Sequence, residues 1–425
     1  MREELLHFVW KFGILPPEGL AATTGECLKI FKTGTLNAHS GPDFIDARIE
    51  INGQLWAGNV EIHLKSSDWY KHNHHTDALY NNVVLHVVWD DDLAVVRKDN
   101  TPIPALELRQ LIPEGLMRTY RKLFRKNQYR FINCENELKQ VNRFILDNWL
   151  ERLYFEKLER KCLEVENAMA DCAHNWEQML FSLLLKNFGL NVNGQAFYYL
   201  SRLVDFGIIR RIGGNRHQLE SLLFGLAGLL DAEGDDPYLM SLKKEFAYLK
   251  QLFGLTTSPV IRPDFARLRP ANFPTLRLSQ FASLYSSQGR LFNLLMSASR
   301  MDQVYELFEV AASQYWDTHY TFGKVSVRKV KWLSRPFIEL LVINTLLPVK
   351  FYYSRFNGKA VEAEILSLLT ELPSEKNKII SRFEAFGLVC ENAMDSQAVL
   401  QLYQAYCRQN RCLDCAVGCR LLRGK

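Results

Sequence analysis

The sequence lacks several features that would place the protein in a special class. It has no uninterrupted run of about 18 apolar residues, so no membrane span is expected. It lacks the basic start and apolar run of an export signal, because Glu3 and Glu4 stand there instead. Its 52 basic and 47 acidic residues leave a net charge of +5, which is too small to indicate a polyanionic partner by itself. We therefore expect a cytoplasmic globular protein with no membrane contact.

The length and the cysteine pattern give a first outline of the domains. A chain of 425 residues is long enough for two or three domains with separate cores. Five of the nine cysteines are scattered along the chain, and without an export signal they are expected to be reduced thiols. These scattered cysteines are Cys27, Cys134, Cys162, Cys172 and Cys390. The other four lie together near the C-terminus.

The β-structure is expected before about residue 112. A helix is predicted over 3–12, and the strands are predicted over 26–33, 44–51, 55–65 and 82–89. Asn52-Gly53 is a strong two-residue hairpin signal, which predicts that the two strands beside it pair antiparallel. The last strand is almost wholly apolar, as expected for a strand buried on both faces.

Ionisable side chains alternate with apolar ones over residues 60–65. This period of two places Glu61, His63 and Lys65 on one face of the strand. Such a face can simply meet water on one side of an antiparallel sheet. An acid, an imidazole and a lysine in succession, with Asp43 just before the neighbouring strand, indicate a functional site instead.

The hairpin register decides whether Asp43 reaches this site. Counting outward from the turn puts Asp43 opposite residue 62, whose side chain is on the other face. A one-residue bulge would bring Asp43 beside His63, and Gly58 is the expected place for it.

These side chains suit metal-dependent hydrolysis. Strand residues two apart are separated by about 6.6 Å, so Asp43, Glu61 and His63 can share a divalent cation that Lys65 does not reach. Two carboxylates with one imidazole suit Mg²⁺ or Mn²⁺ better than Zn²⁺. Lys65 is then expected to stabilise developing charge or to orient a water molecule. The expected catalytic residues for phosphodiester hydrolysis are Asp43, Glu61, His63 and Lys65.

The same stretch resembles the core of the PD-(D/E)xK restriction-endonuclease-like superfamily. In that superfamily an acid after proline and an acid two residues before a lysine hold the metal, and the lysine assists catalysis. Asp43 follows Pro42, and Lys65 matches the lysine. Position 63 departs from the pattern, because it is histidine and the nearest acid is Glu61. The resemblance implies a nuclease-like domain over about residues 23–110.

A second resemblance extends over nearly the whole chain. The segments 41–44 (GPDF), 58–63 (GNVEIH), 67–69 (SDW) and 85–88 (LHVV) resemble the signature of an uncharacterised family of bacterial cytoplasmic proteins. This resemblance implies no particular reaction.

A second polar cluster follows the catalytic stretch. His72, His74, His75 and Asp77 are superficially similar to the metal-binding motif of metallo-β-lactamase-like hydrolases, but the acid follows the later histidines and no final histidine comes after it. These histidines are expected to supplement the first site or to bind a substrate phosphate. His86, within an apolar strand, is expected to be a hydrogen-bonded core histidine.

Residues 116–131 combine many basic side chains with aromatic ones and contain no acid. Such a helix can contact a nucleic-acid backbone, or it can cover apolar surface with its long basic stems. The candidate backbone contacts are Arg118, Arg121, Lys122, Arg125 and Lys126.

The C-terminal cysteines form the second constellation with metal-binding spacing. Cys407, Cys412, Cys415 and Cys419 lie within thirteen residues, in the pattern C-x4-C-x2-C-x3-C. Four thiolates at such spacing bind Zn²⁺ or an iron–sulfur cluster, here in a structural role. The alternative is a set of ordinary cysteines on a terminal helix.

Together these features predict an α+β protein: a small N-terminal mixed or antiparallel sheet, nuclease-like, followed by a large all-α region. The expected domains are 1–112, 113–277 and 278–425. The expected function is a metal-dependent nuclease-like phosphodiesterase acting on nucleic acid. The alternative is an inactive nucleic-acid-binding or scaffold protein that retains the fold.

Overall fold

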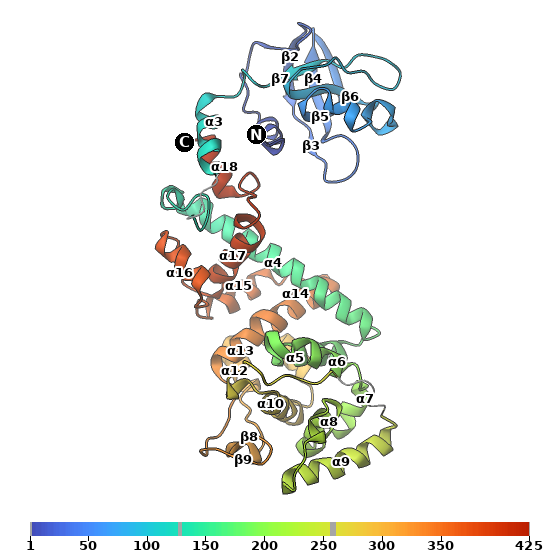
Figure 1. Ribbon diagram of the computed structural model, residues 1–425, viewed down its shortest axis with the longest axis vertical. Helices are drawn as coiled ribbons and strands as arrows, with labels where there is room; N and C mark the ends of the chain where they lie inside the picture. Colours follow the sequence, from blue (N-terminus) through green and yellow to red (C-terminus); the bar gives the residue numbers. More distant parts are fainter. Residues whose placement is uncertain (1, 126–129, 256–260, 425) are drawn as a thin grey trace. The chain divides into compact units, whose positions relative to one another are not determined.

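The computed structural model describes residues 2–125, 130–255 and 261–424 (Figure 1). The chain divides into two compact units. The first unit comprises Met1–Trp149, Ala385–Leu388 and Leu402–Lys425, and the second comprises Leu150–Glu384 and Val389–Gln401. The boundaries of these units differ from the expected domain boundaries at residues 112 and 277. The C-terminal cysteine segment belongs to the same unit as the N-terminal sheet.

The first unit contains a mixed seven-stranded sheet, as the α+β prediction required. Its strands are β1 (Leu20–Ala21), β2 (Cys27–Lys32), β3 (Thr35–Leu36), β4 (Phe44–Ile51), β5 (Gln54–Lys65), β6 (Val83–Asp90) and β7 (Ala105–Glu107). They lie in the order β1-β2-β4-β5-β6-β7, with β3 beside β4. The pairs from β1 to β5 are antiparallel, whereas β5 pairs with β6, and β6 with β7, in parallel.

The β4–β5 hairpin forms where the sequence predicts it. Asn52 and Gly53 have φ angles of 50° and 82°, the left-handed values that a tight turn between right-twisted strands requires. β6 is buried along most of its length, which confirms the prediction from its apolar sequence.

The first unit also contains helices, some packed on the sheet and others in the C-terminal segment. They are α1 (Glu4–Lys11), α2 (Asp68–Lys71), α3 (Glu114–Leu123) and α18 (Ala416–Arg423), with short helical turns η1 (His74–Thr76), η2 (Ala78–Tyr80), η3 (Leu138–Gln140) and η8 (Leu402–Cys407). α1 packs on the sheet through the fully buried Leu5, Leu6 and Val9. α18 lies beside α3, and Leu422 joins the same core (Figure 1).

Among its described residues, the second unit is helical apart from one small hairpin and the connecting segments. Its helices are α4 (Arg143–Asp171, of which the residues up to Trp149 belong to the first unit), α5 (Trp176–Phe188), α6 (Leu190–Ser201), α7 (Phe206–Ile212), α8 (Arg216–Leu226), α9 (Pro237–Phe253), α10 (Pro274–Ser287), α11 (Leu291–Ser297), α12 (Met301–Leu307), α13 (Arg335–Leu341), α14 (Leu347–Phe356), α15 (Glu362–Thr370), α16 (Lys378–Ala385) and α17 (Ala393–Gln401). The hairpin consists of β8 (His319–Thr321) and β9 (Lys324–Val325). The short helical segments of this unit are η4 (Leu229–Asp231), η5 (Pro270–Asn272), η6 (Gln314–Asp317) and η7 (Val342–Leu346). The large all-α region predicted from the sequence is therefore present.

Candidate functional site

A bulge in β4 brings Asp43 level with Glu61. Phe44 pairs with Val60 and Ala47 with Gly58, so β4 has one more residue than β5 between these pairs. The Asp43 backbone N–H donates to Oε2 of Glu61 at 3.1 Å, and the Ile62 N–H donates to Oδ2 of Asp43 at 2.9 Å. The two carboxylates are thereby fixed on paired strands.

The predicted bulge was on the wrong strand. The extra residue lies in β4, where Asp46 has a φ of 56°, and Asp43 therefore aligns with Glu61 rather than His63. Gly58 has a different purpose, because a Cβ there would lie 2.4 Å from Cγ1 of Val84 and 2.6 Å from the carbonyl oxygen of Asn82. The glycine lets β6 approach β5 closely.

The polar face of β5 does not meet water. Glu61 is 5% exposed and His63 is 2% exposed, although the alternation of β5 would allow a solvated face. A buried carboxylate and a buried imidazole need partners, since leaving either unpaired costs free energy. The interpretation of these residues as an ordinary wet strand is therefore excluded.

The partners are other histidines. Nδ1 of His63 lies 2.9 Å from Nε2 of His86, which is fully buried on β6. On its other side, Nε2 of His63 lies 3.1 Å from Nδ1 of His72. His86 is a hydrogen-bonded core histidine, as predicted, and its partner is the predicted site residue His63.

His72 and His74 reach the site from the segment after α2. His72 ends α2, and Asn73, with a φ of 64°, turns the chain so that His74 begins η1. Nε2 of His74 lies 3.2 Å from Oε1 of Glu61, and the same oxygen lies 3.5 Å from Nε2 of His63. His75 points elsewhere, against the ring of Tyr70 with 5.1 Å between ring centroids.

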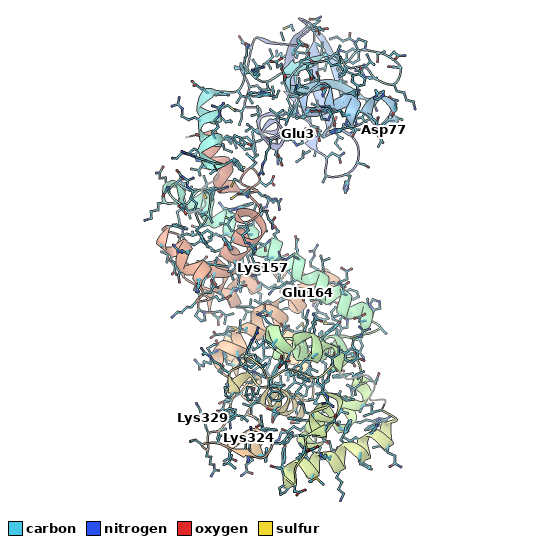
Figure 2. The ribbon with its side chains drawn as sticks, viewed as in Figure 1. Glu3, Asp77, Lys157, Glu164, Lys324 and Lys329 are labelled. Atoms are coloured by element: carbon cyan, nitrogen blue, oxygen red, sulfur yellow. The ribbon has the colours of Figure 1, made fainter. Side chains whose placement is uncertain are left out.

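α1 closes another side of the site with two residues that the sequence analysis missed. Nε2 of His7 lies 3.3 Å from Oδ2 of Asp43. Glu3, labelled in Figure 2, precedes His7 by one helical turn. The sequence shows that Glu3 and His7 are four residues apart, but no sequence feature indicates that α1 contacts the start of β4.

Burial and mutual repulsion perturb the titration of these groups. Burial, and then the neighbouring imidazoles, lower the pKa of His63 to about 3, and burial lowers the pKa of His86 to about 3. Burial also raises the pKa of Glu61, against the opposing effect of His74. Burial and the nearby carboxylates raise the pKa of Glu3 to about 7. At neutral pH His63 and His86 are therefore uncharged imidazoles.

The donor atoms have the spacing of ligands around one cation. The ligand atoms of His63, His72 and His74 all lie within 4.8 Å of one another. Ligands about 2.1 Å from a metal ion lie about 3.0–3.4 Å apart in octahedral or tetrahedral geometry. The separations of 3.1, 3.2 and 3.5 Å among these histidines and Glu61 fall close to this range.

The position of one imidazole nitrogen supports the fit. Nε2 of His74 is buried and forms no hydrogen bond within the described part of the chain, although it lies 3.2 Å from Oε1 of Glu61. A nitrogen so close to an oxygen but misaligned for a hydrogen bond is placed as a co-ligand would be. Three imidazoles with one carboxylate suit Mn²⁺, Fe²⁺ or Zn²⁺ better than Mg²⁺.

Lys65 is not brought to this group. Its side chain is 52% exposed, and Nζ lies 3.7 Å from Asp90 and 3.5 Å from Asp92. The rise along β5 carries it past the cluster to the end of the strand. Of the four predicted catalytic residues, the structure gathers Asp43, Glu61 and His63.

The predicted basic helix is α3, which ends at Leu123 rather than continuing to 131. Arg118, Arg121, Lys122 and Arg125 are exposed on or just after it, and Lys126 lies outside the described residues. Lys122 forms an ion pair with Glu137 at 2.6 Å.

The cysteine segment is also partly rearranged from the prediction. Cys407, Cys412 and Cys415 line one small cavity, and the other cysteine that lines it is Cys134. Cys419 does not line this cavity, and its Sγ donates to the carbonyl oxygen of Leu413 at 3.0 Å.

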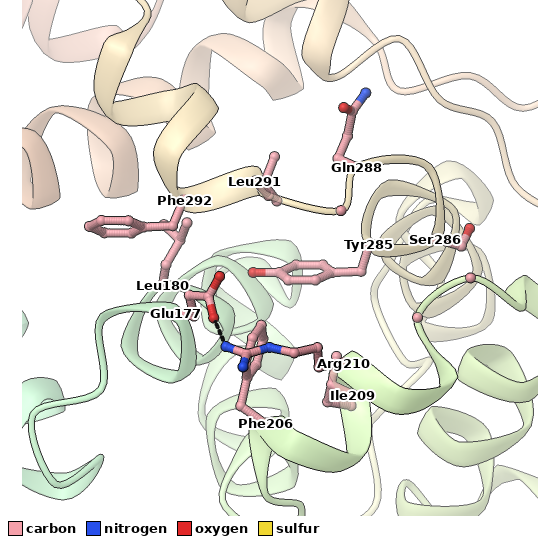
Figure 3. A pocket seen from close by; sticks show the side chains of 13 residues that line it. Glu177, Leu180, Phe206, Ile209, Arg210, Tyr285, Ser286, Gln288, Leu291 and Phe292 are labelled. Carbon is pink, nitrogen blue, oxygen red and sulfur yellow. Dashed lines mark hydrogen bonds and ion pairs between the residues drawn. The ribbon is translucent and has the colours of Figure 1, made fainter.

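The helical unit has a pocket of a different character (Figure 3). Glu177 and Arg210 form an ion pair across it, and Tyr285 points its hydroxyl toward this pair (Figure 3). Most of the remaining lining is apolar, including Leu180, Phe206 and Phe292. Glu177 and Arg210 satisfy each other, whereas the buried hydroxyl of Tyr285 has no hydrogen-bond partner among the described residues.

Comparison with known proteins gives a family but no reaction. A family described as "Protein of unknown function (DUF2851)" matches residues 3–378. No curated protein and no solved structure matches the chain. Over residues 2–125, 130–255 and 261–424, one helical stretch, Arg335–Phe356, is long and apolar enough to cross a membrane, and 67% of its apolar window is buried inside the protein.

Proposed function

Because the chain belongs to the DUF2851 family, whose description names no reaction, we propose from the site itself that the protein is a metal-dependent phosphodiesterase acting on nucleic acid. The observation that carries the proposal is the convergence of Asp43 and Glu61 with His63, His72 and His74. A divalent cation held there would lower the pKa of a water molecule and polarise a phosphoryl oxygen.

The residues of the chain have separable tasks in this proposal. Glu61, His63, His72 and His74 bind the cation. Asp43 completes the site from β4, and its hydrogen bond from the Ile62 N–H fixes the orientation of its carboxylate. His86 holds the ring of His63 in place from β6.

The acid–base chemistry would come from α1. His7 lies against Asp43, and this carboxylate raises the pKa of His7 although burial opposes it. A histidine whose protonated form is favoured by a carboxylate can give that proton to a leaving oxygen, and its neutral form can take one from water. The side chain of His7 is 24% exposed although its Nε2 is buried against Asp43, so the ring is partly accessible to a substrate.

The proposal changes the assignment suggested by the PD-(D/E)xK resemblance. In the structure Glu61 is level with Asp43, and His63 stands two residues later, where the pattern has its lysine. The acid pair is therefore Asp43 with Glu61, and Lys65 has no catalytic task. We retain nucleic acid as the substrate because exposed basic residues of α3 belong to the same unit. The scattered cysteines Cys27, Cys134, Cys162 and Cys172 are unbridged thiols, which suits the reducing cytoplasm.

The test is divalent-ion-dependent cleavage of single- and double-stranded DNA and RNA. We expect cleavage with Mn²⁺, lost at least a hundredfold in Asp43→Ala and Glu61→Gln and retained in Lys65→Ala. If Lys65→Ala lost activity while Asp43→Ala and Glu61→Gln retained it, the assignment of catalytic residues would be overturned. A wild-type protein that binds Mn²⁺ but cleaves no polymer would overturn the proposed activity.

The second candidate is a nucleic-acid-binding or scaffold protein without activity. The observation that favours it is the buried His63 in place of the lysine of the resemblance. This candidate predicts salt-sensitive binding of DNA or RNA without cleavage, and no effect of Asp43→Ala on that binding.

A further inference from the structure

Four cysteines from two distant parts of the sequence surround one cavity of the first unit. Cys134 comes from the segment after α3, whereas Cys407, Cys412 and Cys415 come from the C-terminal segment. Cys412 and Cys415 are buried, and all four are free thiols. The other residues that line this cavity include Leu123, Tyr406 and Gly418.

Local backbone geometry aims these thiols at the cavity. Cys415 is the N-cap residue of α18, where the helix begins beside the cavity. Asn133 donates through Nδ2 to Sγ of Cys412 at 3.4 Å. N–H donors directed at sulfur stabilise a thiolate, and such hydrogen bonds are a common support of cysteine ligands in metal centres.

The fit around the cavity is close. A Cβ on Gly418 would lie 2.0 Å from the carbonyl oxygen of Cys412, so only glycine allows α18 to begin so near the Cys412 loop. This approach brings Cys412 and Cys415 to the same cavity.

Burial makes the thiols weak nucleophiles. It raises the pKa of Cys134 and Cys407 far above the ordinary range, and it raises the pKa of Cys415 to about 12. Without a metal they are neutral thiols, which react with an alkylating agent more slowly than an exposed cysteine does. Binding of a thiophilic metal releases their protons and gives each sulfur a partner.

The spacing of the sulfur atoms indicates the kind of centre. Sulfurs bound to one Zn²⁺ at about 2.3 Å lie about 3.8 Å apart. Within the part of the chain that the structure describes, the histidine group is the only set of three or more such ligands within 4.8 Å of one another. No three of the four sulfurs therefore lie within 4.8 Å of one another, which is a wider spacing than one Zn²⁺ requires and favours a cluster of several iron atoms.

We propose that Cys134, Cys407, Cys412 and Cys415 hold an iron–sulfur cluster, and that Cys419 is not a ligand. The cluster fastens residues 402–425 to the N-terminal part of the first unit. Gln409–Asp414, the loop that carries Cys412, lines a second pocket together with Arg2, His7 and Lys11 of the α1 region. The cluster therefore supports one wall of this second pocket, which also contains His7 of the candidate site.

The test uses the full chain purified without oxygen. We expect about four iron and four sulfide per chain, with a broad absorption band in the visible region. Cys134→Ala loses this iron, whereas the matched variant Cys419→Ala keeps it. If Cys134→Ala kept the iron and Cys419→Ala lost it, the proposed ligand set would be overturned. One zinc per chain without iron, or no metal, overturns the cluster.

A second measurement does not depend on the folding of a variant. Alkylation of the wild-type protein, mapped by mass spectrometry, should modify the exposed Cys27 with or without iron. Cys134, Cys407, Cys412 and Cys415 should be protected in the iron-loaded protein and react after the iron is removed with a chelator. Equal reactivity of Cys134 in both forms overturns the proposal.

Discussion

Replacing His86 with leucine tests whether the buried histidines form a built metal site. His86 has no exposed surface, and its Nε2 lies 2.9 Å from Nδ1 of His63. This contact decides which nitrogen of His63 carries the proton, and it holds the ring toward His72 and Glu61. Leucine fills a similar apolar volume but provides no partner for the ring.

The expected loss can be estimated from comparable sites. Loss of a partner that orients a metal-binding histidine typically costs about 10–100-fold in affinity, which corresponds to about 1.4–2.7 kcal/mol. In the absence of the ion, Nδ1 of His63 is left buried without a partner, which costs about 1–3 kcal/mol of folding stability. We therefore expect both weaker ion binding and a moderately less stable apo-protein.

The assay is calorimetric titration with Mn²⁺, which prefers nitrogen and oxygen ligands and so avoids the cysteine site. His75→Leu is the matched control, because His75 lies in the same segment as His74 but packs against Tyr70. We expect His75→Leu to bind Mn²⁺ like the wild type. A folded His86→Leu protein with unchanged affinity, or an equal loss in His75→Leu, would refute the reasoning.

Three further predictions concern the framework of the site and the helical unit. Gly58→Ala should lower the free energy of unfolding by about 1–3 kcal/mol in urea titration, since its Cβ would clash with Val84. The control variant Gly115→Ala, which has open space around it, should not lose stability, and equal stabilities of the two variants would contradict this role of Gly58. Asp46→Val should be about 1–2 kcal/mol less stable than Asp46→Gly, because both variants lose the ion pair with Lys32 but only glycine accepts a φ of 56° without strain. A valine variant as stable as the glycine variant would refute the bulge geometry. Burial lowers the pKa of Lys157 from 10.5 to about 8, a change worth about 3 kcal/mol, so the charged lysine destabilises the folded state below pH 8 and the unfolded state binds more protons between pH 8 and 10.5. The stability of the wild type relative to Lys157→Met, measured by urea denaturation, should therefore rise across this interval, and a flat difference would contradict the prediction.

Local sequence signals were sufficient for the secondary structure around the site. Asn52-Gly53 fixed the hairpin, and the apolar run of β6 indicated a strand buried on both faces. The bulge could not be located, because the role of Gly58 depends on Val84 of a strand that lies beyond the hairpin. Counting residues from the turn along β4 and β5 gives no information about how closely β6 approaches them.

The residues that complete the two clusters come from segments far apart in the sequence. His7 reaches Asp43 only because α1 packs on the sheet, and Cys134 resembles the other scattered cysteines until the C-terminal segment joins the first unit. His72 and His74 were identified as possible contacts, but their closeness to His63 depends on the left-handed turn at Asn73. Contacts of this kind are decided by tertiary packing, which a pattern of neighbouring residues does not encode.

The most direct test of the proposed metal site is an anomalous difference map from crystals grown with Mn²⁺. A cation bound there gives one peak per chain, within bonding distance of His63, His72, His74 and Glu61 and close to Asp43. Data from a well-occupied crystal with no peak there, and with manganese bound only elsewhere on the protein, would contradict it.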